Sequence, residues 1–300
     1  MIHHLVLMGE VADFSLKDGM LVSGANKVAI QVLGSVQCLS PHAKWSQYAL
    51  CTLSRQCPVI MASWNGHTKK WDTSGILPRC RYVNPDATFR VCNLNAKRST
   101  AYASALLFTK VENQHTLIRS LNPALAPLPK LAANSYNRIL QLEAKWARFF
   151  WAMYFKAASQ DLFAREKRQA SAPLNVALNY GYGFLYHALE WQCVASGIEP
   201  GIGIIHRLRR SRPSLVCDLI EQFRCCVEIT IMRNLDEMHD PKLMAGRFAE
   251  MMESTWAYAN KRFRLRTIIR LVVESFVKSL IFNDITTYRP FSLHARDACL

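Results

Sequence analysis

The first 72 residues alternate between apolar and polar positions in short runs, which is typical of β-strands. Asp18-Gly19 separates Phe14–Leu16 from Met20–Val22, and this arrangement predicts a tight hairpin. Further strands are predicted at Val28–Val32, Val59–Trp64 and, after an Asn65-Gly66 turn, His67–Trp71. One helix interrupts the strands, with Ser40 as its cap, Pro41 at its first position and Pro58 just beyond its end.

From Thr100 onward the spacing of apolar residues changes to that of helices. Predicted helices cover residues 100–121, 139–155, 175–196, 214–232, 241–256 and 261–282. Three prolines, Pro123, Pro127 and Pro129, end the first of them. Gly197 is placed to end the third, and Ser214 can cap the start of the fourth.

These patterns predict an α+β protein with two domains of unequal size. Residues 1–72 form a small N-terminal β-strand domain, 73–98 a connector containing Gly75, Pro78 and Pro85, and 99–300 a larger all-α domain. A chain of 300 residues is long enough to build both cores.

The chain is strongly basic. Lys and Arg number 37 against 22 acidic residues, for a net charge of +15. This balance favours a polyanionic partner, either nucleic acid or a membrane surface, although a basic enzyme without such a partner has the same composition. Ile268–Phe282 is the longest apolar segment, but Arg270, Glu274 and Lys278 form one polar stripe along it, so no membrane span is expected.

The ten cysteines show no paired C-x-x-C spacing of the kind found in zinc sites. Reduced thiols are therefore expected. The N-terminus has no basic start followed by an apolar core, so no export signal is predicted. Together these features predict a cytoplasmic protein.

The candidate chemistry lies between residues 175 and 224. Glu190 falls within an apolar helical stretch, His206 follows a Gly-rich turn, and Asp218 and Glu221 share one helix face. Carboxylates with an imidazole suit a hard or borderline divalent cation. Taken singly, each has a simpler explanation: a solvated glutamate, a hydrogen-bonded core histidine, and acids that favour the N-terminal end of a helix.

The same segment resembles CRISPR-associated endonuclease one, the integrase family that inserts new spacers into CRISPR arrays. The resemblance rests on a long ordered pattern: Asn179-Tyr180-Gly181-Tyr182, Leu185-Tyr186, Glu190, Gly197, Pro200, Gly203, His206, Arg212-Pro213-Ser214-Leu215, Asp218-Leu219 and Glu221 through Arg224. Weaker matches are Lys110 with Asn113-Gln114, Leu142-Glu143, and Pro173 with Asn175.

The resemblance implies that Glu190, His206 and Glu221 bind Mg²⁺ or Mn²⁺, with Asp218 as an outer or alternative ligand. It implies an integrase and endonuclease in which the 3′-hydroxyl of a prespacer attacks the repeat phosphodiester. Implied partners are double-stranded DNA, both prespacer and CRISPR repeat, and a second copy of the chain bound through the N-terminal domain to form a homodimer or larger assembly. A requirement for CRISPR-associated protein two is left open.

Arginines are expected to position the DNA backbone. The candidates are Arg165, Arg168, Arg207, Arg209, Arg210 and Arg212, with Lys167 beside the second of them. A third basic cluster, Lys261 to Arg266, is a weaker candidate because it can simply begin an exposed helix.

The sequence departs from the family pattern at several positions outside the proposed ligand set. Ser211 and Ala144 stand where glycines are common, Cys225-Cys226 replaces a proline-containing step, and Glu228 replaces an aspartate. Two other functions remain open: a non-catalytic DNA-binding scaffold and a transposon-borne integrase. Intact Glu190, His206 and Glu221 disfavour the scaffold, and the lack of an added DNA-binding domain favours the CRISPR role.

Overall fold

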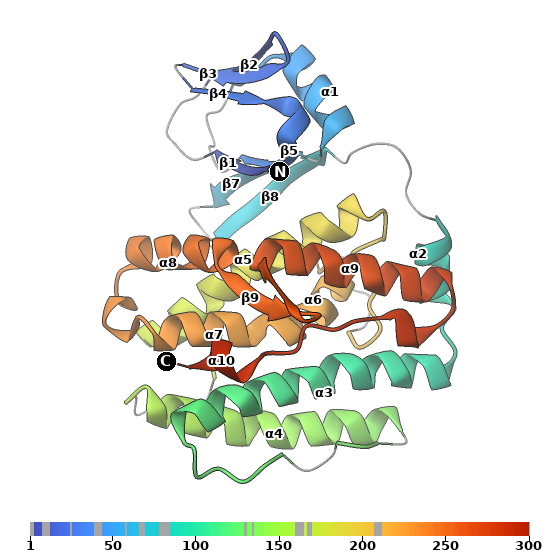
Figure 1. The fold of residues 1–300 in the computed structure, drawn as a ribbon, viewed down its shortest axis with the longest axis vertical. Coiled ribbons are helices and arrows are strands. Elements are labelled where there is room, and N and C mark those ends of the chain that lie inside the picture. Colours follow the sequence, from blue (N-terminus) through green and yellow to red (C-terminus); the bar gives the residue numbers. More distant parts are fainter. Residues whose placement is uncertain are drawn as a thin grey trace. The chain divides into compact units, whose positions relative to one another are not determined.

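The computed structural model describes residues 3–7, 13–24, 26–38, 44–57, 59–65, 70–77, 85–128, 131–133, 135–159, 165–166, 170–206 and 212–299. The chain divides into two compact units, residues 1–84 and 85–300 (Figure 1).

The N-terminal unit contains two four-stranded sheets and one helix. The first sheet has the order β1-β5-β7-β8 and is formed by His3–Leu7, Leu33–Cys38, Val59–Asn65 and Lys70–Leu77. The second has the order β4-β3-β2-β6 and is formed by Asn26–Ala29, Met20–Ser23, Asp13–Lys17 and Lys44–Trp45. Apolar residues between the strands and α1, including Phe14, Val36 and Leu53, make a small separate core.

The predicted Asp18-Gly19 hairpin is confirmed. Strands β2 and β3 pair antiparallel around it, and both turn residues have positive φ, 51° at Asp18 and 73° at Gly19. That geometry matches the twist of the flanking strands and suits Asp-Gly. β7 and β8 pair antiparallel, as predicted for two strands joined at Asn65-Gly66, but β8 continues past the predicted end at Trp71 to Leu77; residues 66–69 lie outside the described part of the chain.

The helix of this unit begins later than predicted. Helix α1 is Gln47–Gln56, and Ser46 is its cap, accepting a hydrogen bond from the Ala49 amide at 3.1 Å. Lys44–Trp45 pairs with β2 instead of entering the helix. The predicted cap Ser40 and first residue Pro41 lie outside the described residues, and the pairing of Lys44–Trp45 with β2 shows that the helix does not extend back to them.

The C-terminal unit is mainly helical. Its helices are α2 Pro85–Cys92, α3 Ala96–Leu121, α4 Tyr136–Ala157, α5 Pro173–Ala195, α6 Ser214–Leu219, α7 Arg224–Met232, α8 Pro241–Glu253, α9 Leu265–Ile281 and α10 Ala295–Ala298. Short 3₁₀ segments occur at Ile30–Val32 (η1) in the first unit and, in this one, at Ile220–Phe223 (η2), Leu235–Glu237 (η3) and Ile285–Thr287 (η4). The segment predicted as a connector, residues 73–98, includes the later part of β8 and all of α2.

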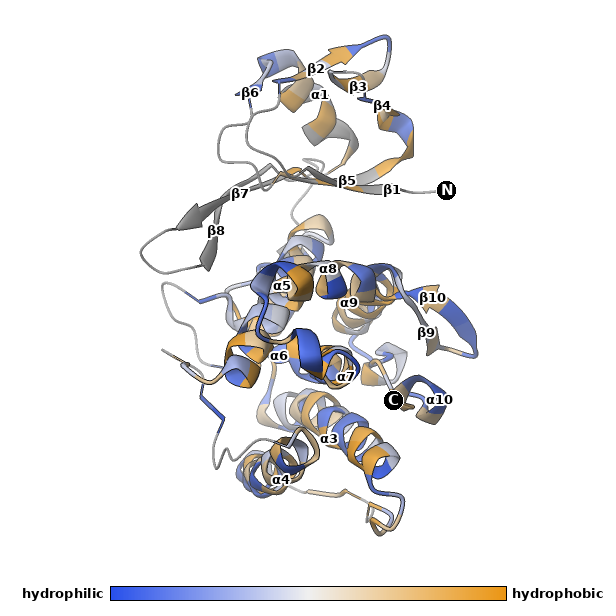
Figure 2. Ribbon diagram, turned by 90° about the vertical axis from the view of Figure 1, so that its left-hand side faces the viewer, coloured by the Kyte–Doolittle hydropathy of each residue, from blue (hydrophilic) through white to orange (hydrophobic). Residues whose placement is uncertain are grey.

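Helix α5 is central to this unit. It packs against α6, α7, α8 and α9, while α3 and α4 lie side by side (Figure 1). At Gly181 a Cβ would come within 2.5 Å of Val227 and 2.7 Å of the Phe248 ring, so glycine allows the close approach of α7 and α8. Apolar and polar positions alternate around helices such as α3, and one large core joins them (Figure 2).

Two predictions for this unit are wrong. The domain is not all-α, because β9 Thr255–Tyr258 and β10 Lys261–Arg264 form a hairpin where two helices were predicted to end and begin. Its turn residues, Ala259 and Asn260, both have positive φ. The predicted helix 214–232 is divided by η2, and Pro213, not Ser214, occupies its cap position.

Among the described residues, no helix combines the length and apolar character needed to cross a bilayer.

Candidate active site

Glu190 lies on α5, and its side chain is mostly buried. Its side chain is 17% exposed, and Oε2 is 3.7 Å from Nδ1 of His187. That distance is too long for a strong hydrogen bond. Burial together with the nearby charge of Glu190 raises the pKa of the Tyr186 phenol. Glu190 is therefore a loosely held carboxylate beside a neutral tyrosine.

The end of α5 leads into the His206 loop through a well-formed helix terminus. Gly197 has φ 73°, and the Ile198 amide donates to the Cys193 carbonyl at 3.1 Å. This agrees with the predicted role of Gly197 in ending the helix. The glycine thereby directs the chain back toward α6, where the next candidate residues lie.

The Asp218 carboxylate accepts hydrogen bonds from the backbone of the loop that carries His206. This fully buried carboxylate accepts hydrogen bonds from the backbone amides of Ile204, Ile205 and His206 at 2.5, 2.9 and 3.0 Å. Gly203 is needed here because a Cβ would lie 2.8 Å from Asp218 Oδ2 and 2.6 Å from the His206 carbonyl oxygen. The loop is thus built around one carboxylate.

The same carboxylate sets the orientation of the His206 ring. Nδ1 of His206 lies 2.6 Å from Asp218 Oδ1. Because a carboxylate accepts, Nδ1 is the donor of this bond, and in the neutral ring the lone pair is then on Nε2. The His206 side chain is 31% exposed. Its outer nitrogen is therefore prepared to bind a cation.

Glu221 is buried within a group of paired charges. Its oxygens lie 2.8 Å from Arg224 and 2.7 Å from Lys110, and Lys110 also contacts Glu143 at 2.6 Å. Burial alone would raise the pKa of Glu221, but the charges of Arg224 and Lys110 lower it well below its usual range. Glu221 is therefore held as an anion.

The side-chain types fit a divalent cation. Glu190 and Glu221 supply carboxylates, and His206 supplies Nε2. The buried Oε2 of Glu221 makes no hydrogen bond of good geometry, although Lys110 is close to it. In the part of the chain that the structure describes, however, no three His, Cys, Asp or Glu side chains are gathered closely enough to hold an ion.

The structure distinguishes Asp218 from the other three residues. Both of its oxygens are used by the 204–206 loop, so the geometry favours the outer role over direct binding. Binding of an ion by Glu190, His206 and Glu221 stays a prediction. α5, which carries Glu190, and η2, which carries Glu221, pack against each other and against α6, whose Asp218 holds the His206 loop.

The arginines predicted to bind DNA differ in where the structure places them. Arg168, Arg207, Arg209 and Arg210 lie outside the described residues. Arg212 is exposed, and its Nε donates to Cys217 Sγ at 2.9 Å. Arg165 donates to the side chains of Asn175 and Asn179 at 3.0 and 2.7 Å and is partly buried, so it is placed to brace the start of α5 rather than to contact a phosphate.

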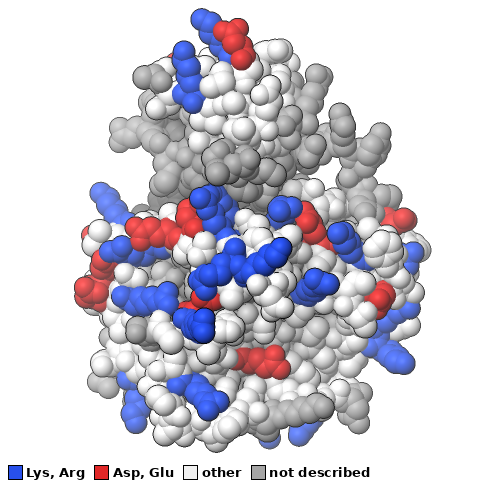
Figure 3. Space-filling view, in the orientation of Figure 1, with Lys and Arg blue, Asp and Glu red and all other residues white. Residues whose placement is uncertain are grey.

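Basic and acidic groups are mixed on the surface of the helical unit. Figure 3 shows acidic side chains beside basic ones on one face. In the weaker cluster around β10, Arg262 pairs with Asp297 at 2.9 Å, and Arg264 and Arg266 pair with Glu253. These pairings support the structural interpretation of that cluster.

The sequence patterns did not reveal a buried polar network behind Arg224. The Arg224 guanidinium lies 4.5 Å from the centre of the Tyr182 ring, and the Tyr182 hydroxyl donates to Glu228 Oε1 at 2.8 Å. Gln114 donates to the same oxygen at 3.0 Å. The signal that could have revealed this network is the polar run Asn113-Gln114 within the apolar face of α3.

The charge group around Glu221 predicts a specific dependence of stability on pH. Because the folded pKa of Glu221 is lowered, its pairing stabilises the protein above the unfolded pKa of about 4.3 and is lost as pH falls below it. Glu221→Gln should therefore cost about 3–5 kcal/mol near pH 7, as expected for breaking a buried pair. The difference from the unchanged protein should shrink as pH falls from about 5 to 3.

Urea unfolding in EDTA across this range measures the effect. Glu274→Gln, which alters an exposed pair with Arg270 on α9, is the control and should change stability by less than about 1 kcal/mol. A Glu221→Gln difference that does not vary with pH would contradict the assignment.

Comparison with known proteins links this arrangement to a family. The profile of the family described as CRISPR associated protein Cas1 matches residues 23–242. A CRISPR-associated endonuclease Cas1 from Saccharolobus solfataricus is 32% identical over 215 residues, covering 65% of this chain and 57% of the relative. One from Pyrobaculum aerophilum is 31% identical over 179 residues, covering 52% and 58%. The chain thus spans less than two thirds of the length of these curated relatives.

Solved structures share the fold. A casposase bound to integration product aligns with a TM-score of 0.71 at 16% identity, over 94% of this chain and 92% of the other. A Cas1 protein from Thermotoga maritima aligns with a TM-score of 0.70 at 12% identity, over 97% and 100%. A chain of a partial Cas6-RT-Cas1–Cas2 complex gives 0.70 at 17% identity, over 97% and 99%.

The fold is the one seen in these casposase and Cas1 structures. The chain belongs to the CRISPR-associated protein Cas1 family.

Proposed function

We propose that this chain is a divalent-metal-dependent DNA integrase and endonuclease. It joins the 3′-hydroxyl of prespacer DNA to a phosphodiester at the edge of a CRISPR repeat, and a 3′-hydroxyl is released. The main support is the Asp218–His206 pair, which leaves the second ring nitrogen of the partly exposed His206 free of this bond and ties His206 to α6, a helix that packs with the elements carrying Glu190 and Glu221. The curated relatives' names as CRISPR-associated endonucleases support the reaction class.

Glu190, His206 Nε2 and Glu221 are the proposed ligands of Mg²⁺ or Mn²⁺. Such an ion would reduce the repulsion between a nucleophile and the phosphodiester and stabilise the charge of the transition state. The protein residues prepare this site before DNA arrives. Asp218 fixes the proton on His206 Nδ1, and Lys110 with Arg224 keeps Glu221 ionised. No protein nucleophile is required, since the attacking group belongs to the DNA.

The proposed partners are prespacer and repeat DNA, a second copy of the chain bound through the N-terminal unit, and a Cas2 protein. The structures of relatives with matching folds include a casposase with integration product and a Cas1–Cas2 complex, by their names. Two strand-joining events at opposite ends of one repeat require two active sites, which favours at least a dimer. Light scattering of the chain, with and without DNA, tests this point, and a strict monomer would contradict it.

An integration assay tests the function itself. Purified protein, prespacer DNA and a supercoiled plasmid carrying a CRISPR repeat are combined with Mn²⁺ or Mg²⁺, with and without Cas2. Joined prespacer–plasmid products are expected with metal and absent in EDTA, and a prespacer with dideoxy 3′ ends should not be joined. Absence of both joining and nicking in every metal condition would overturn the proposal.

A transposon-type integrase is the second candidate, and the likeness to the casposase fold favours keeping it. The same assay separates the two functions. A plasmid without the repeat should receive few insertions if the CRISPR role is correct. Equal insertion into both plasmids would favour the transposon-type function.

A further inference from the structure

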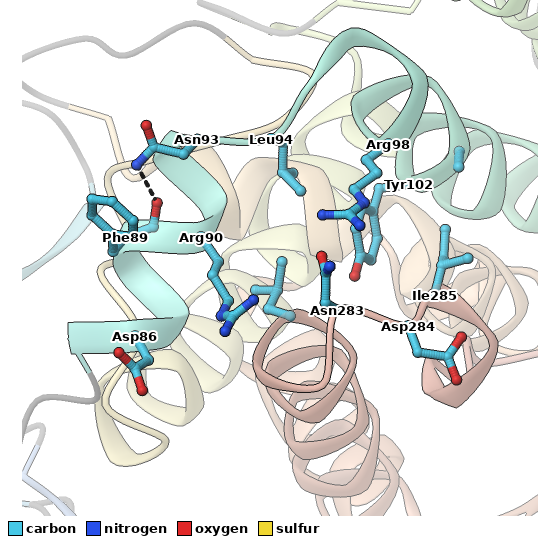
Figure 4. Close-up of a pocket in the computed structure, with 12 residues that line it drawn as sticks. Asp86, Phe89, Arg90, Asn93, Leu94, Arg98, Tyr102, Asn283, Asp284 and Ile285 are labelled. Carbon is cyan, nitrogen blue, oxygen red and sulfur yellow. Dashed lines mark hydrogen bonds between the residues drawn. The ribbon is translucent and has the colours of Figure 1, made fainter.

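A cavity lies in the helical unit, apart from the residues assigned above. Its volume is about 510 Å³, and its walls come from α2, the first turns of α3 and the segment after α9 (Figure 4). Small-molecule sites commonly measure roughly 300–1,000 Å³. None of the proposed metal ligands lines it.

Two arginines point into this cavity without a charged partner. Figure 4 shows the side chains of Arg90, Arg98 and Asn283 directed toward a common space. Within the described ranges, neither arginine forms an ion pair. Other arginines of the same unit do so: Arg224, Arg247, Arg262, Arg264, Arg266 and Arg270. Arg90 and Arg98 are therefore available to an anion.

The two acidic residues of the cavity do not neutralise these arginines. Asp86 and Asp284 lie at opposite sides of the space into which the arginines point (Figure 4). Asp284 instead accepts hydrogen bonds from the backbone and hydroxyl of Thr286, at 2.9 and 2.8 Å, and these bonds lower its pKa. The acids are placed to accept hydrogen bonds at the edges of a ligand.

The N-terminal end of α3 adds positive charge near the cavity, and neighbouring side chains give it an apolar wall. Helix α3 begins at Ala96 with no acidic residue in its first turn, where its N-terminal dipole is positive and Lys97 and Arg98 add to it. Cations at this end of a helix do not stabilise it through the dipole, so the dipole does not account for Lys97 and Arg98. Leu94, Tyr102 and Leu280 supply apolar surface. The cavity therefore places arginine side chains, which can bind a negatively charged oxygen, next to an apolar surface that can pack against an uncharged ring.

We propose that this cavity binds a nucleotide, with its phosphate at Arg90 and Arg98, its sugar and base against the apolar wall, and N–H groups of the base reaching the acidic edges. Arginine recognises phosphate through charge-assisted, bidentate hydrogen bonds. The nucleotide is either free or one unit of a single strand. This site is separate from the proposed metal centre and does not depend on the integrase reaction.

Binding of a fluorescein-labelled five-nucleotide oligothymidylate to the full chain, followed by anisotropy in EDTA, tests the proposal. Arg90→Gln and Arg98→Gln should each weaken binding on the order of tenfold, because each removes a charged hydrogen bond. The control is Arg119→Gln, an exposed arginine near the far end of α3 that carries the same charge. It should change affinity by less than about twofold.

Competitors then identify the source of the nucleotide. Displacement of the probe by thymidine monophosphate assigns the cavity to free nucleotides, and binding of the oligonucleotide alone assigns it to a strand; both outcomes support the site. Equal weakening by Arg119→Gln, or competition by inorganic phosphate equal to that by thymidine monophosphate, would overturn it. Glu190→Ala protein should bind the probe normally, so failure of the integrase assignment is distinguishable from failure of this one.

Discussion

Glu190→Ala should reduce strand joining by on the order of 1,000-fold, because a bound metal supplies several kcal/mol of transition-state stabilisation and each 1.36 kcal/mol is a tenfold change in rate. The fold should persist. Glu190 is 17% exposed and comes no closer than 3.7 Å to a charged partner among the described residues, so its removal breaks no strong ion pair. Joining rates and thermal unfolding by circular dichroism, measured on the same preparation, separate the two effects.

A matched variant controls for the loss of one carboxylate on a helix. Glu274→Ala removes a carboxylate that is 39% exposed and paired with Arg270 on α9. Its joining rate should stay within about twofold of the unchanged protein, since exposed pairs contribute little. Joining by Glu190→Ala at a similar rate would remove Glu190 from the proposed metal site.

Asp218→Asn should damage the site by a different route. Asparagine keeps the shape but replaces one acceptor oxygen with an amide donor, which faces backbone amides or His206 Nδ1. Each buried group left without a partner costs about 1–3 kcal/mol, so thermal stability should fall together with activity. Residues that orient metal ligands typically change metal affinity by about 10–100-fold when mutated.

Glu221→Gln is the comparison that separates a ligand from a residue that positions one. It should raise the Mn²⁺ concentration needed for half-maximal joining by more than Asp218→Asn does. Mn²⁺ should also support joining at a lower concentration than Mg²⁺, because the ligand set includes an imidazole. If Glu221→Gln works normally and Asp218→Asn is inactive, Asp218 is the third ligand and the assignment of Glu221 is wrong.

Local sequence signals predicted much of the fold because they act over a few residues. Asp18-Gly19 requires a turn with positive φ, and Gly197 ends α5, so both were identified from residue type alone. The β9–β10 hairpin was missed because its strands, Thr255–Tyr258 and Lys261–Arg264, are short and continue a helical apolar pattern. Distant contacts stabilise it instead: Asp297 accepts from the Ala257 amide at 2.8 Å and pairs with Arg262 at 2.9 Å.

In the candidate site, too, contacts between residues close in the sequence could be predicted, and contacts between distant residues could not. The spacing of Asp218 and Glu221 placed both on one helix face, but only the structure shows that one supports the His206 loop while the other pairs with Lys110. Lys110 lies more than one hundred residues earlier, on α3. Such a pairing has no short-range signal. Similarly, Arg165 was an expected DNA contact, and the asparagines that engage it are on the facing start of α5.

The central claim is that Glu190, His206 and Glu221 hold one divalent ion while Asp218 supports the histidine. Anomalous diffraction at the manganese edge, from crystals of the full chain grown with Mn²⁺ and DNA, tests it most directly. We predict one manganese peak bound by Glu190, His206 Nε2 and Glu221, with Asp218 contacting only the His206 loop. A peak coordinated by Asp218, or one that excludes Glu190, would contradict it.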